Sequence, residues 1–395
     1  MNNQLDSLTE YPFQYLSNLV TDIKKDPKEL IGLHIGEPKG NSPKEALDII
    51  NNHSTSFSKY PTSSGEIALR ESYCNELIGR FNIKNIDPNK HVLPLAGSRE
   101  GIFAFIQSAI DNTKKSPKVL LPNPFYKIYE GAAIMAGAEP YYVDSIESER
   151  FRPDIESVPE EVWEDCQIFI ICSPSNPTGY CLSKEEYEVL LEKADKYNFF
   201  LCSDECYTDI YESTSNPPIG LLECDDVTRR DSKSIVFHSL SKRSNLAGLR
   251  SGFICAGEEI IEKISLYRTY HGVTLSLPVQ MASTWAWTNT EHVKKNRIEY
   301  DKKYQTAISC LEPTVKIDRP DGGFYIWLKL PCDDQEFAKL LYRNESILSL
   351  PGSYLGKENN GSNPGKGFLR LAVVHDIETI QKAFSAVNKT LLNFQ

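Results

Sequence analysis

The chain lacks the features by which proteins bind nucleic acid or anionic membranes without sequence preference. Its 43 Lys and Arg residues are outnumbered by 54 Asp and Glu residues, and the formal net charge is −11 at pH 7. No block of about five or more like charges forms a tail that would bind such polyanions by itself. We therefore expect neither nucleic acid nor a membrane among its partners, and small molecules as its ligands.

Signals for export, membrane insertion and metal binding are also missing. The longest apolar runs, such as Gln167–Cys172, are far too short to span a bilayer. The start of the chain, Met1–Asp6, has no basic region followed by an apolar stretch, so no secretion signal is expected. Ten cysteines occur without a Cys-x-x-Cys pair, which leaves zinc and dithiol redox sites unsupported. These absences predict a cytoplasmic protein without a metal site.

What the chain does contain is a regular alternation of strand-like and helix-like segments. At 395 residues it exceeds what one hydrophobic core usually fills, so we expect two lobes. Apolar, β-branched runs alternate with stretches of helical spacing at Arg99–Ile110, Tyr126–Ala136 and Lys184–Tyr197. The pattern predicts an α/β fold with a doubly wound, mostly parallel sheet, and ligands at the carboxyl ends of its strands. The seven expected strands are His91–Leu95, Lys118–Leu121, Pro140–Val143, Gln167–Cys172, Phe199–Cys202, Ser234–His238 and Ser251–Ala256.

The character of the sequence changes near residue 290. A charged helical run over residues 292–309 is followed by short strand-like runs at 322–327 and 367–371, which predicts a smaller α+β domain. We expect three parts: a proline-interrupted N-terminal segment (1–45) that packs on the small domain, a large domain (46–290), and the small C-terminal domain (291–395).

The most informative stretch is Ser239-Leu240-Ser241-Lys242, with Arg250 eight residues further on. A lysine that attacks a carbonyl must be partly neutral, and both desolvation and nearby positive charge favour the neutral form. Arg250 supplies such a charge, and together with the serines it also supplies groups that bind an anion. The alternative is a solvated loop, which is the commoner place for a lysine flanked by serines.

Two motifs that follow predicted strands carry groups suited to bind a ligand: one binds a phosphate, and the other donates a hydrogen bond to a phenolate oxygen. Gly97, Ser98 and Arg99 open a helix, whose first N–H groups bind phosphate, although an ordinary helix cap is the alternative. Asn176 lies in a turn held by two prolines, which suits an amide that donates to a phenolate oxygen. The alternative is that Asn176 only closes the turn.

Two further motifs place charges in apolar surroundings. Asp204, with Tyr207 three residues later, ends an apolar strand, and a buried aspartate needs a cationic partner such as a protonated pyridine nitrogen. A helix cap at Asp204 is the alternative. Arg370 lies in an apolar strand of the small domain and is suited to hold a carboxylate in a bidentate fork, from a ligand or from the protein itself.

Together these motifs resemble a known family. Asn176-Pro177-x-Gly179, Asp204-x-x-Tyr207, Ser239-x-x-Lys242 and Arg250 stand in the order and spacing of class I aminotransferases, the pyridoxal-phosphate enzymes of fold type I. The resemblance extends from Gly36 to Arg370. It implies that the chain is an enzyme that uses pyridoxal 5'-phosphate.

The resemblance also implies a role for each matched residue. Lys242 forms the Schiff base with the cofactor and moves the substrate proton, and Asp204 pairs with the pyridine nitrogen. Asn176 and Tyr207 bind the ring oxygen, and Tyr126 stacks on the ring. The phosphate is held by Gly97, Ser98, Arg99, Ser239 and Arg250.

Substrate and partner contacts follow from the same resemblance. Arg370 binds the substrate α-carboxylate, with Asn176 beside it, and Gly36 lets the backbone approach that group closely. Tyr60 matches a tyrosine that reaches the phosphate from the neighbouring subunit, so we expect a homodimer with shared active sites.

The expected reaction moves an amino group from glutamate to a 2-oxo acid in two half-reactions, by a ping-pong mechanism. Residues 239–245 and 267–274 look like the N-succinyldiaminopimelate aminotransferase branch of the family, which works in lysine and diaminopimelate synthesis. A distal succinyl carboxylate requires a cation far from Arg370, which Arg268 or His271 would supply unless both are structural. Val273-Thr274-Leu275 departs from the Cys-Ala-Met of that branch.

Three rival functions share this scaffold. An aromatic or kynurenine aminotransferase and a C–S lyase would keep every cofactor residue and change only the substrate pocket. A non-enzymatic, cofactor-sensing regulator would need a basic winged-helix domain ahead of the fold. We do not expect one, because the chain is acidic and its family motifs begin by Gly36.

Overall fold

A seven-stranded sheet forms the centre of the larger lobe in the computed structural model, which describes residues 1–312 and 314–394. Strand β8 runs antiparallel to both of its neighbours, β2 and β7, and the other neighbouring strands pair in parallel. All seven expected strands are present within a few residues of their expected bounds, which confirms the predicted α/β class. In sheet order they are β2 (Val92–Leu95), β8 (Gly252–Cys255), β7 (Ser234–Ser239), β6 (Phe200–Asp204), β5 (Cys166–Cys172), β3 (Lys118–Asn123) and β4 (Glu139–Asp144).

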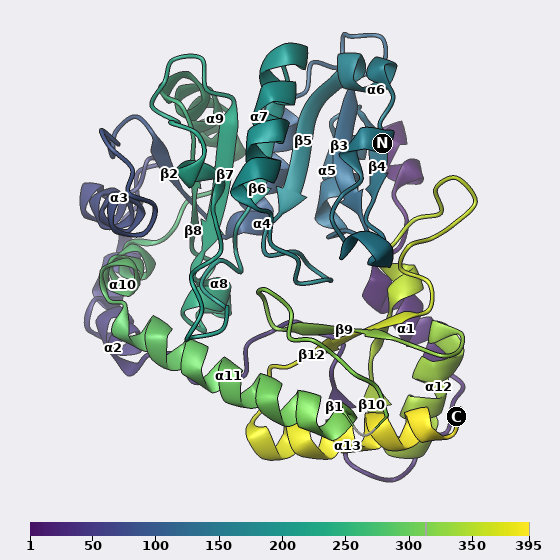
Figure 1. The fold of residues 1–395 in the computed structure, drawn as a ribbon. Coiled ribbons are helices and arrows are strands. Elements are labelled where there is room, and N and C mark those ends of the chain that lie inside the picture. The colour runs from purple at the N-terminus through teal and green to yellow at the C-terminus, as the bar shows by residue number, and fades with distance from the viewer. Residues whose placement is uncertain (313, 395) are drawn as a thin grey trace.

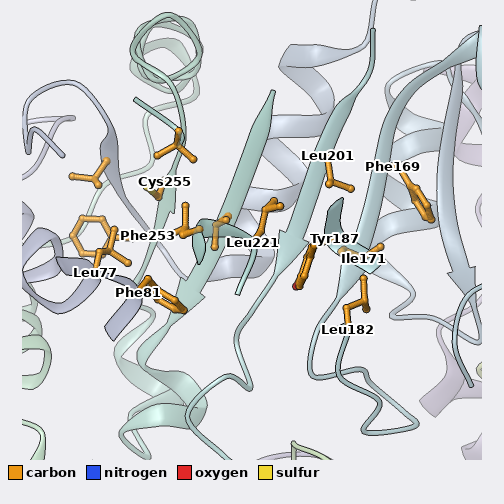
Figure 2. Packing of buried hydrophobic residues seen from close by; sticks show 14 of the residues in the cluster. Leu77, Phe81, Phe169, Ile171, Leu182, Tyr187, Leu201, Leu221, Phe253 and Cys255 are labelled. Atoms are coloured by element: carbon orange, nitrogen blue, oxygen red, sulfur yellow. The ribbon is translucent and has the colours of Figure 1, made fainter. Parts of the chain in front are cut away.

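Helices cover both faces of this sheet because its strands are apolar on both sides. Along β5, Ile168 and Ile170 belong to one buried cluster and Phe169 and Ile171 to another, as expected when successive side chains alternate. Figure 2 shows part of the second cluster, where Tyr187 lies among strand residues. The first cluster includes residues of α4 (Ser98–Ala109), α5 (Ile128–Met135) and α9 (Glu258–His271); the second includes residues of α3 (Ile67–Phe81), α6 (Glu160–Asp165), α7 (Lys184–Tyr197) and α10 (Leu277–Thr288).

The smaller lobe is built on a three-stranded antiparallel sheet and three long helices. The sheet has the order β11 (Leu350–Pro351), β12 (Phe368–Ala372), β9 (Tyr325–Lys329). Helix α11 (Glu291–Leu311) runs below the large sheet beside α13 (Ile377–Leu392), with α12 (Asp334–Glu345) near the C-terminus (Figure 1). The remaining helices and strands are α1 (Pro12–Val20), α2 (Lys44–Asn52), α8 (Leu240–Arg243), β1 (Ile31–Gly32) and β10 (Ile347–Leu348).

The N-terminal segment joins both lobes. Strand β1 pairs in parallel with β10, and Leu16 and Val20 of α1 pack with Leu350 and Leu355. The first turn, a 3₁₀ helix over Asn3–Ser7, instead lies against α5 of the large lobe. The three-part division at residues 45 and 290 stays a prediction.

Among the described residues, no helix is both long and apolar enough to cross a membrane.

Candidate active site

A cavity of about 500 Å³ opens at the carboxyl ends of three neighbouring strands of the large sheet. Cys172 ends β5, Asp204 ends β6 and Ser239 ends β7, and all three line the cavity. The small lobe and the N-terminal segment close the other side. Most of the residues matched by motif meet here: Gly36, Ser98, Arg99, Tyr126, Asn176, Asp204, Tyr207, Ser239, Lys242, Arg250 and Arg370.

Lys242 reaches into the cavity from the short helix α8. Its Nζ donates a hydrogen bond to the carbonyl oxygen of Gly36 at 2.5 Å and lies 5.2 Å from the centre of the Phe324 ring. Burial lowers the pKa of Lys242 to about 8, and the charges of Arg370 and Arg250 act in the same direction. The amine is therefore partly neutral near physiological pH, as a nucleophile must be.

Asp204 is a buried carboxylate without a cation. Its Oδ2 accepts the hydroxyl hydrogen of Tyr129 at 2.8 Å, and its Oδ1 accepts the backbone N–H of Cys206 at 3.3 Å. Burial raises the pKa of Asp204, against these donors. No lysine, arginine or histidine among residues 1–312 and 314–394 lies within ion-pair distance of it. A cationic ligand group would supply the missing counter-charge.

An anion-binding corner lies at the start of α4. Gly97, the residue before this helix, has φ +83°, and a Cβ there would clash with the Arg250 guanidinium. The positive φ favours glycine at this position, and a larger residue would displace the Arg250 guanidinium. Arg250 is anchored by the carbonyl oxygens of Ala247 and Ala96 at 2.9 and 3.4 Å. Its remaining N–H groups and the helix N-terminus favour a phosphate.

Arg370 and Asn176 orient each other. Arg370 Nη1 donates to Asn176 Oδ1 at 2.9 Å, and Nη2 donates to the backbone oxygen of His34 at 2.7 Å. Because a guanidinium only donates, the amide oxygen must face it, and the amide NH₂ of Asn176 is left to donate elsewhere. Arg370 Nε is buried without a hydrogen-bond partner, and no acidic side chain of the described residues pairs with Arg370. This favours a ligand carboxylate over a protein one.

Two tyrosines of the expected site also line the cavity. Arg99 Nε donates to the hydroxyl of Tyr126 at 2.7 Å. The hydroxyl of Tyr207 lies 3.3 Å from that of Tyr325. Burial raises the pKa of both Tyr126 and Tyr207, so both phenols remain protonated donors at neutral pH.

Tyr60 does not reach the cavity of its own chain. Its side chain is fully exposed to solvent. This exposure leaves it available to a second copy, but the homodimer stays a prediction.

The expected distal roles of Arg268 and His271 are wrong for the cavity of the same chain. Arg268 is buried and donates to both carboxylate oxygens of Glu100 at 3.1 Å, and to the backbone oxygens of Pro94 and Val273. His271 lies 4.0 Å from the same Glu100. Neither side chain lines the cavity. Sequence offered no sign of this ion pair, because Glu100 precedes Arg268 by 168 residues.

Arg243, the residue directly after Lys242, likewise points away from the cavity. The buried guanidinium of Arg243 lies 2.8 Å from Glu76 and 3.6 Å from Asp209, and it stacks over Trp287 at 5.1 Å. Arg243 therefore holds α8 in place, and it does not contact a substrate in the cavity.

Sequence reasoning missed Tyr129, Tyr325 and Tyr11, which all line the cavity. Tyr129 follows Tyr126 by only three residues, but Tyr126 precedes α5 and Tyr129 lies within it, so helical spacing did not relate them. Tyr325 and Tyr11 come from distant parts of the chain and carry no local signal.

Comparison with known proteins relates the whole chain to one family. The family model described as aminotransferase class I and II matches residues 28–387. An LL-diaminopimelate aminotransferase from Aquifex aeolicus is 30% identical, over 99% of each chain. The crystal structure of an aminotransferase from Neisseria meningitidis is 38% identical with a TM-score of 0.95, covering 99% of this chain and 100% of that one. A probable N-succinyldiaminopimelate aminotransferase from Thermus thermophilus, at 24% identity and a TM-score of 0.86 over 96% of this chain and 100% of that one, shares the fold.

Proposed function

Because the chain belongs to the class I and II aminotransferases, we propose that it moves an amino group from glutamate to a 2-oxo acid through two half-reactions at this cavity. Pyridoxal 5'-phosphate is the cofactor of this family. The main support for the proposal is that two groups line the same cavity. One is the buried amine of Lys242, whose pKa is lowered to about 8, and the other is the carboxylate of Asp204, which has no cationic partner among the described residues.

The residues present fit this cofactor group by group. Asp204 has no cationic partner in the described part of the chain, and a protonated pyridine nitrogen would supply one. The N-terminus of α4 and Arg250 form a cradle for the phosphate. The free amide NH₂ of Asn176 and the hydroxyl of Tyr207 are donors for the ring oxygen, and Tyr126 offers an aromatic face.

When bound, pyridoxal 5'-phosphate supplies a carbonyl that condenses with amines and a ring that withdraws electrons from the substrate α-carbon. Asp204 keeps the ring nitrogen protonated, and this strengthens that withdrawal. With the cofactor bound, Lys242 Nζ would hold its carbonyl carbon, and as a free amine it would take up and return the proton of the substrate α-carbon. The lowered pKa of Lys242, caused mainly by burial, provides the neutral amine that this proton transfer requires.

Arg370 binds the α-carboxylate of each substrate in turn. Its Nη1 and Nη2 are held by Asn176 and the backbone of His34, and its Nε is left unpartnered. The anchored guanidinium fixes the amino group of the substrate with respect to Lys242, which lowers the entropic cost of the reaction.

We also propose a homodimer in which Tyr60 of each chain reaches the phosphate in the other subunit. The support is the motif match of Tyr60 in Lys59-Tyr60-Pro61, and the full exposure of its side chain leaves it available to a second copy. A cytoplasmic location is in keeping with the cysteines, which are all free.

For the amino-acid substrate we propose N-succinyldiaminopimelate, as the motif resemblance suggests. Arg99 lines the cavity in addition to Lys242, Arg250 and Arg370 and is the candidate for a distal carboxylate, whereas the lining cation Lys127 is already paired with Glu130. This replaces the distal role expected for Arg268 and His271.

LL-diaminopimelate is a second candidate. Glu37 and Asp204 are the acidic residues among the described lining residues, and the exposed carboxylate of Glu37, which pairs with Lys39 at 2.7 Å, suits a free distal ammonium, which succinylation removes. The Aquifex aeolicus relative carries the name of this substrate. Aromatic amino acids and C–S bond cleavage remain as rivals on the same scaffold.

The deciding experiment measures glutamate formed from 2-oxoglutarate with each candidate: N-succinyl-LL-diaminopimelate, LL-diaminopimelate, aspartate and aromatic amino acids. We expect the highest kcat/KM for the succinylated substrate. A preference for LL-diaminopimelate that is lost in Glu37→Gln would instead select the second candidate. Release of pyruvate and ammonia from cystathionine without glutamate formation would overturn transamination itself.

A further inference from the structure

Tyr325, the first residue of β9 in the small lobe, lies between two groups of the proposed mechanism. Its hydroxyl is 3.3 Å from the hydroxyl of Tyr207, and its ring lies under the Arg370 guanidinium, 4.3 Å from Cζ to the ring centre. All three side chains are at least 95% buried and line the cavity.

The hydroxyl of Tyr325 has a defined direction. A Cβ placed on Gly36 would overlap it, so the hydroxyl is packed against the backbone whose carbonyl oxygen accepts from Lys242. Within the described residues, the Tyr207 hydroxyl is its hydrogen-bond partner. If Tyr207 donates its hydrogen to the cofactor ring oxygen, the Tyr207 oxygen is left to accept from Tyr325.

The ring of Tyr325 has a separate task. The two hydrogen bonds of Arg370, to Asn176 and to the backbone of His34, fix the edge of the guanidinium, while the Tyr325 ring supports its face. A cation stacked on a phenol ring is attracted by the ring quadrupole, and the attraction grows when both are shielded from water.

We infer that Tyr325 is a positioning residue that links Arg370, the group that binds the substrate carboxylate, to Tyr207, the group that binds the cofactor ring oxygen. Its hydroxyl polarises the O–H of Tyr207, and its ring orients Arg370. The inference rests on the proposed function, since it assumes the cofactor contact of Tyr207 and the carboxylate contact of Arg370.

The hydroxyl is tested by the pH dependence of the absorption spectrum of the resting holoenzyme. Without the Tyr325 hydroxyl, Tyr207 donates a weaker hydrogen bond to the cofactor ring oxygen, and the deprotonated form of the bound cofactor is stabilised less. In Tyr325→Phe we therefore expect the pKa at which the cofactor absorbance changes to rise by about 0.5 to 1. Tyr207→Phe should raise it further, and the double variant should equal Tyr207→Phe alone. Tyr187→Phe is the matched control, since it removes a buried hydroxyl bonded to Ser203 outside the cavity and should leave the spectrum unchanged.

The ring is tested by spectral titration of the resting holoenzyme with 2-oxoglutarate, which binds as a carboxylate without reacting. We expect the dissociation constant to rise less than twofold in Tyr325→Phe and about 3- to 10-fold in Tyr325→Leu. Circular dichroism melting of both variants verifies that they are folded.

The two levels of failure are distinguishable. If Tyr207→Phe shifts the pKa and Tyr325→Phe does not, or if shifts add in the double variant, the link through Tyr325 is wrong while the proposed function stands. An unchanged spectrum in Tyr207→Phe would overturn the cofactor contact itself. Equal 2-oxoglutarate affinity in Tyr325→Leu and the unmodified enzyme would overturn the orienting role of the ring.

Discussion

Lys242 Nζ donates to the carbonyl oxygen of Gly36 at 2.5 Å, although 206 residues separate the two in sequence. The contact holds the amine inside the cavity, where burial lowers its pKa to about 8. It also ties the large lobe to the N-terminal segment, so the nucleophile is correctly placed only when that segment has docked.

Covalent trapping tests the nucleophile. Borohydride treatment of the holoenzyme should fix the cofactor on the peptide that contains Lys242, because reduction makes the carbon–nitrogen double bond permanent. Lys242→Ala should bind the cofactor without a covalent link and lose transaminase activity by a factor of at least about 10³. Lys118→Arg is the control, since Lys118 pairs with Glu139 and does not line the cavity. Labelling of any other lysine would contradict the proposal.

The pKa of Lys242 can be measured through the pH dependence of cofactor attachment. Only the neutral amine attacks a carbonyl, so the rate of covalent attachment to the apoenzyme at saturating cofactor should rise about tenfold from pH 6 to pH 7 and level off above a pKa of about 8. Arg370→Gln removes a positive charge that lowers this pKa, and should move the profile to higher pH. A rate still climbing tenfold between pH 9 and pH 10 in the unmodified protein would show an ordinary lysine.

Tyr129 is expected to support the ionised form of Asp204. Tyr129→Phe removes the O–H that the carboxylate accepts at 2.8 Å, so the pKa of Asp204 should rise further and its pairing with the ring nitrogen should weaken. We expect the dissociation constant of the cofactor, measured by equilibrium dialysis, to be about tenfold higher in Tyr129→Phe. Tyr180→Phe, which loses a hydrogen bond to Glu186 outside the cavity, should keep the original affinity. If Tyr129→Phe bound the cofactor as tightly as the unmodified protein, the remaining hydrogen-bond donors to Asp204 would be sufficient to keep it ionised.

Subunit mixing tests whether Tyr60 serves the second copy. Tyr60→Ala and Lys242→Ala should each be nearly inactive as pure proteins. After random reassortment, half of the dimers are hybrids, and each hybrid has one intact site of two, so about a quarter of the original activity should return. Activity that stays at the level of the parent variants after verified subunit exchange would show that each site uses its own Tyr60.

Arg268 should matter for stability and not for substrate choice. Arg268→Met leaves the carboxylate of Glu100 without its buried partner and should cost about 3 to 5 kcal/mol in the free energy of unfolding. The double variant Arg268→Met with Glu100→Met should recover part of this loss. The ratio of kcat/KM for succinylated and free diaminopimelate should be unchanged in the folded variant, and a selective loss of the succinylated substrate would restore the distal role first expected for Arg268.

Patterns of a few residues predicted the large sheet well. Val, Ile and Leu runs between helical segments located all seven of its strands, because strand and helix periodicities are local properties of the backbone. The capping box of α7, from Ser183 to Glu186, is another local signal, and the helix runs over the expected residues 184–197. The motif residues at the ends of β5, β6 and β7 meet for a related reason, since carboxyl ends of parallel strands lie at one edge.

The sequence by itself thus determined the order of strands and helices and the chemical types of group that converge on the cavity: an amine, an acid, an amide and two arginines. Only the tertiary structure decided which charged side chains form ion pairs. It paired Arg268 with Glu100 and Arg243 with Glu76, left Arg370 and Asp204 without charged partners among residues 1–312 and 314–394, and brought Tyr325 between Tyr207 and Arg370. The reason is physical: a buried charge must be compensated, but the group that compensates it is chosen by packing between segments hundreds of residues apart, or by a ligand.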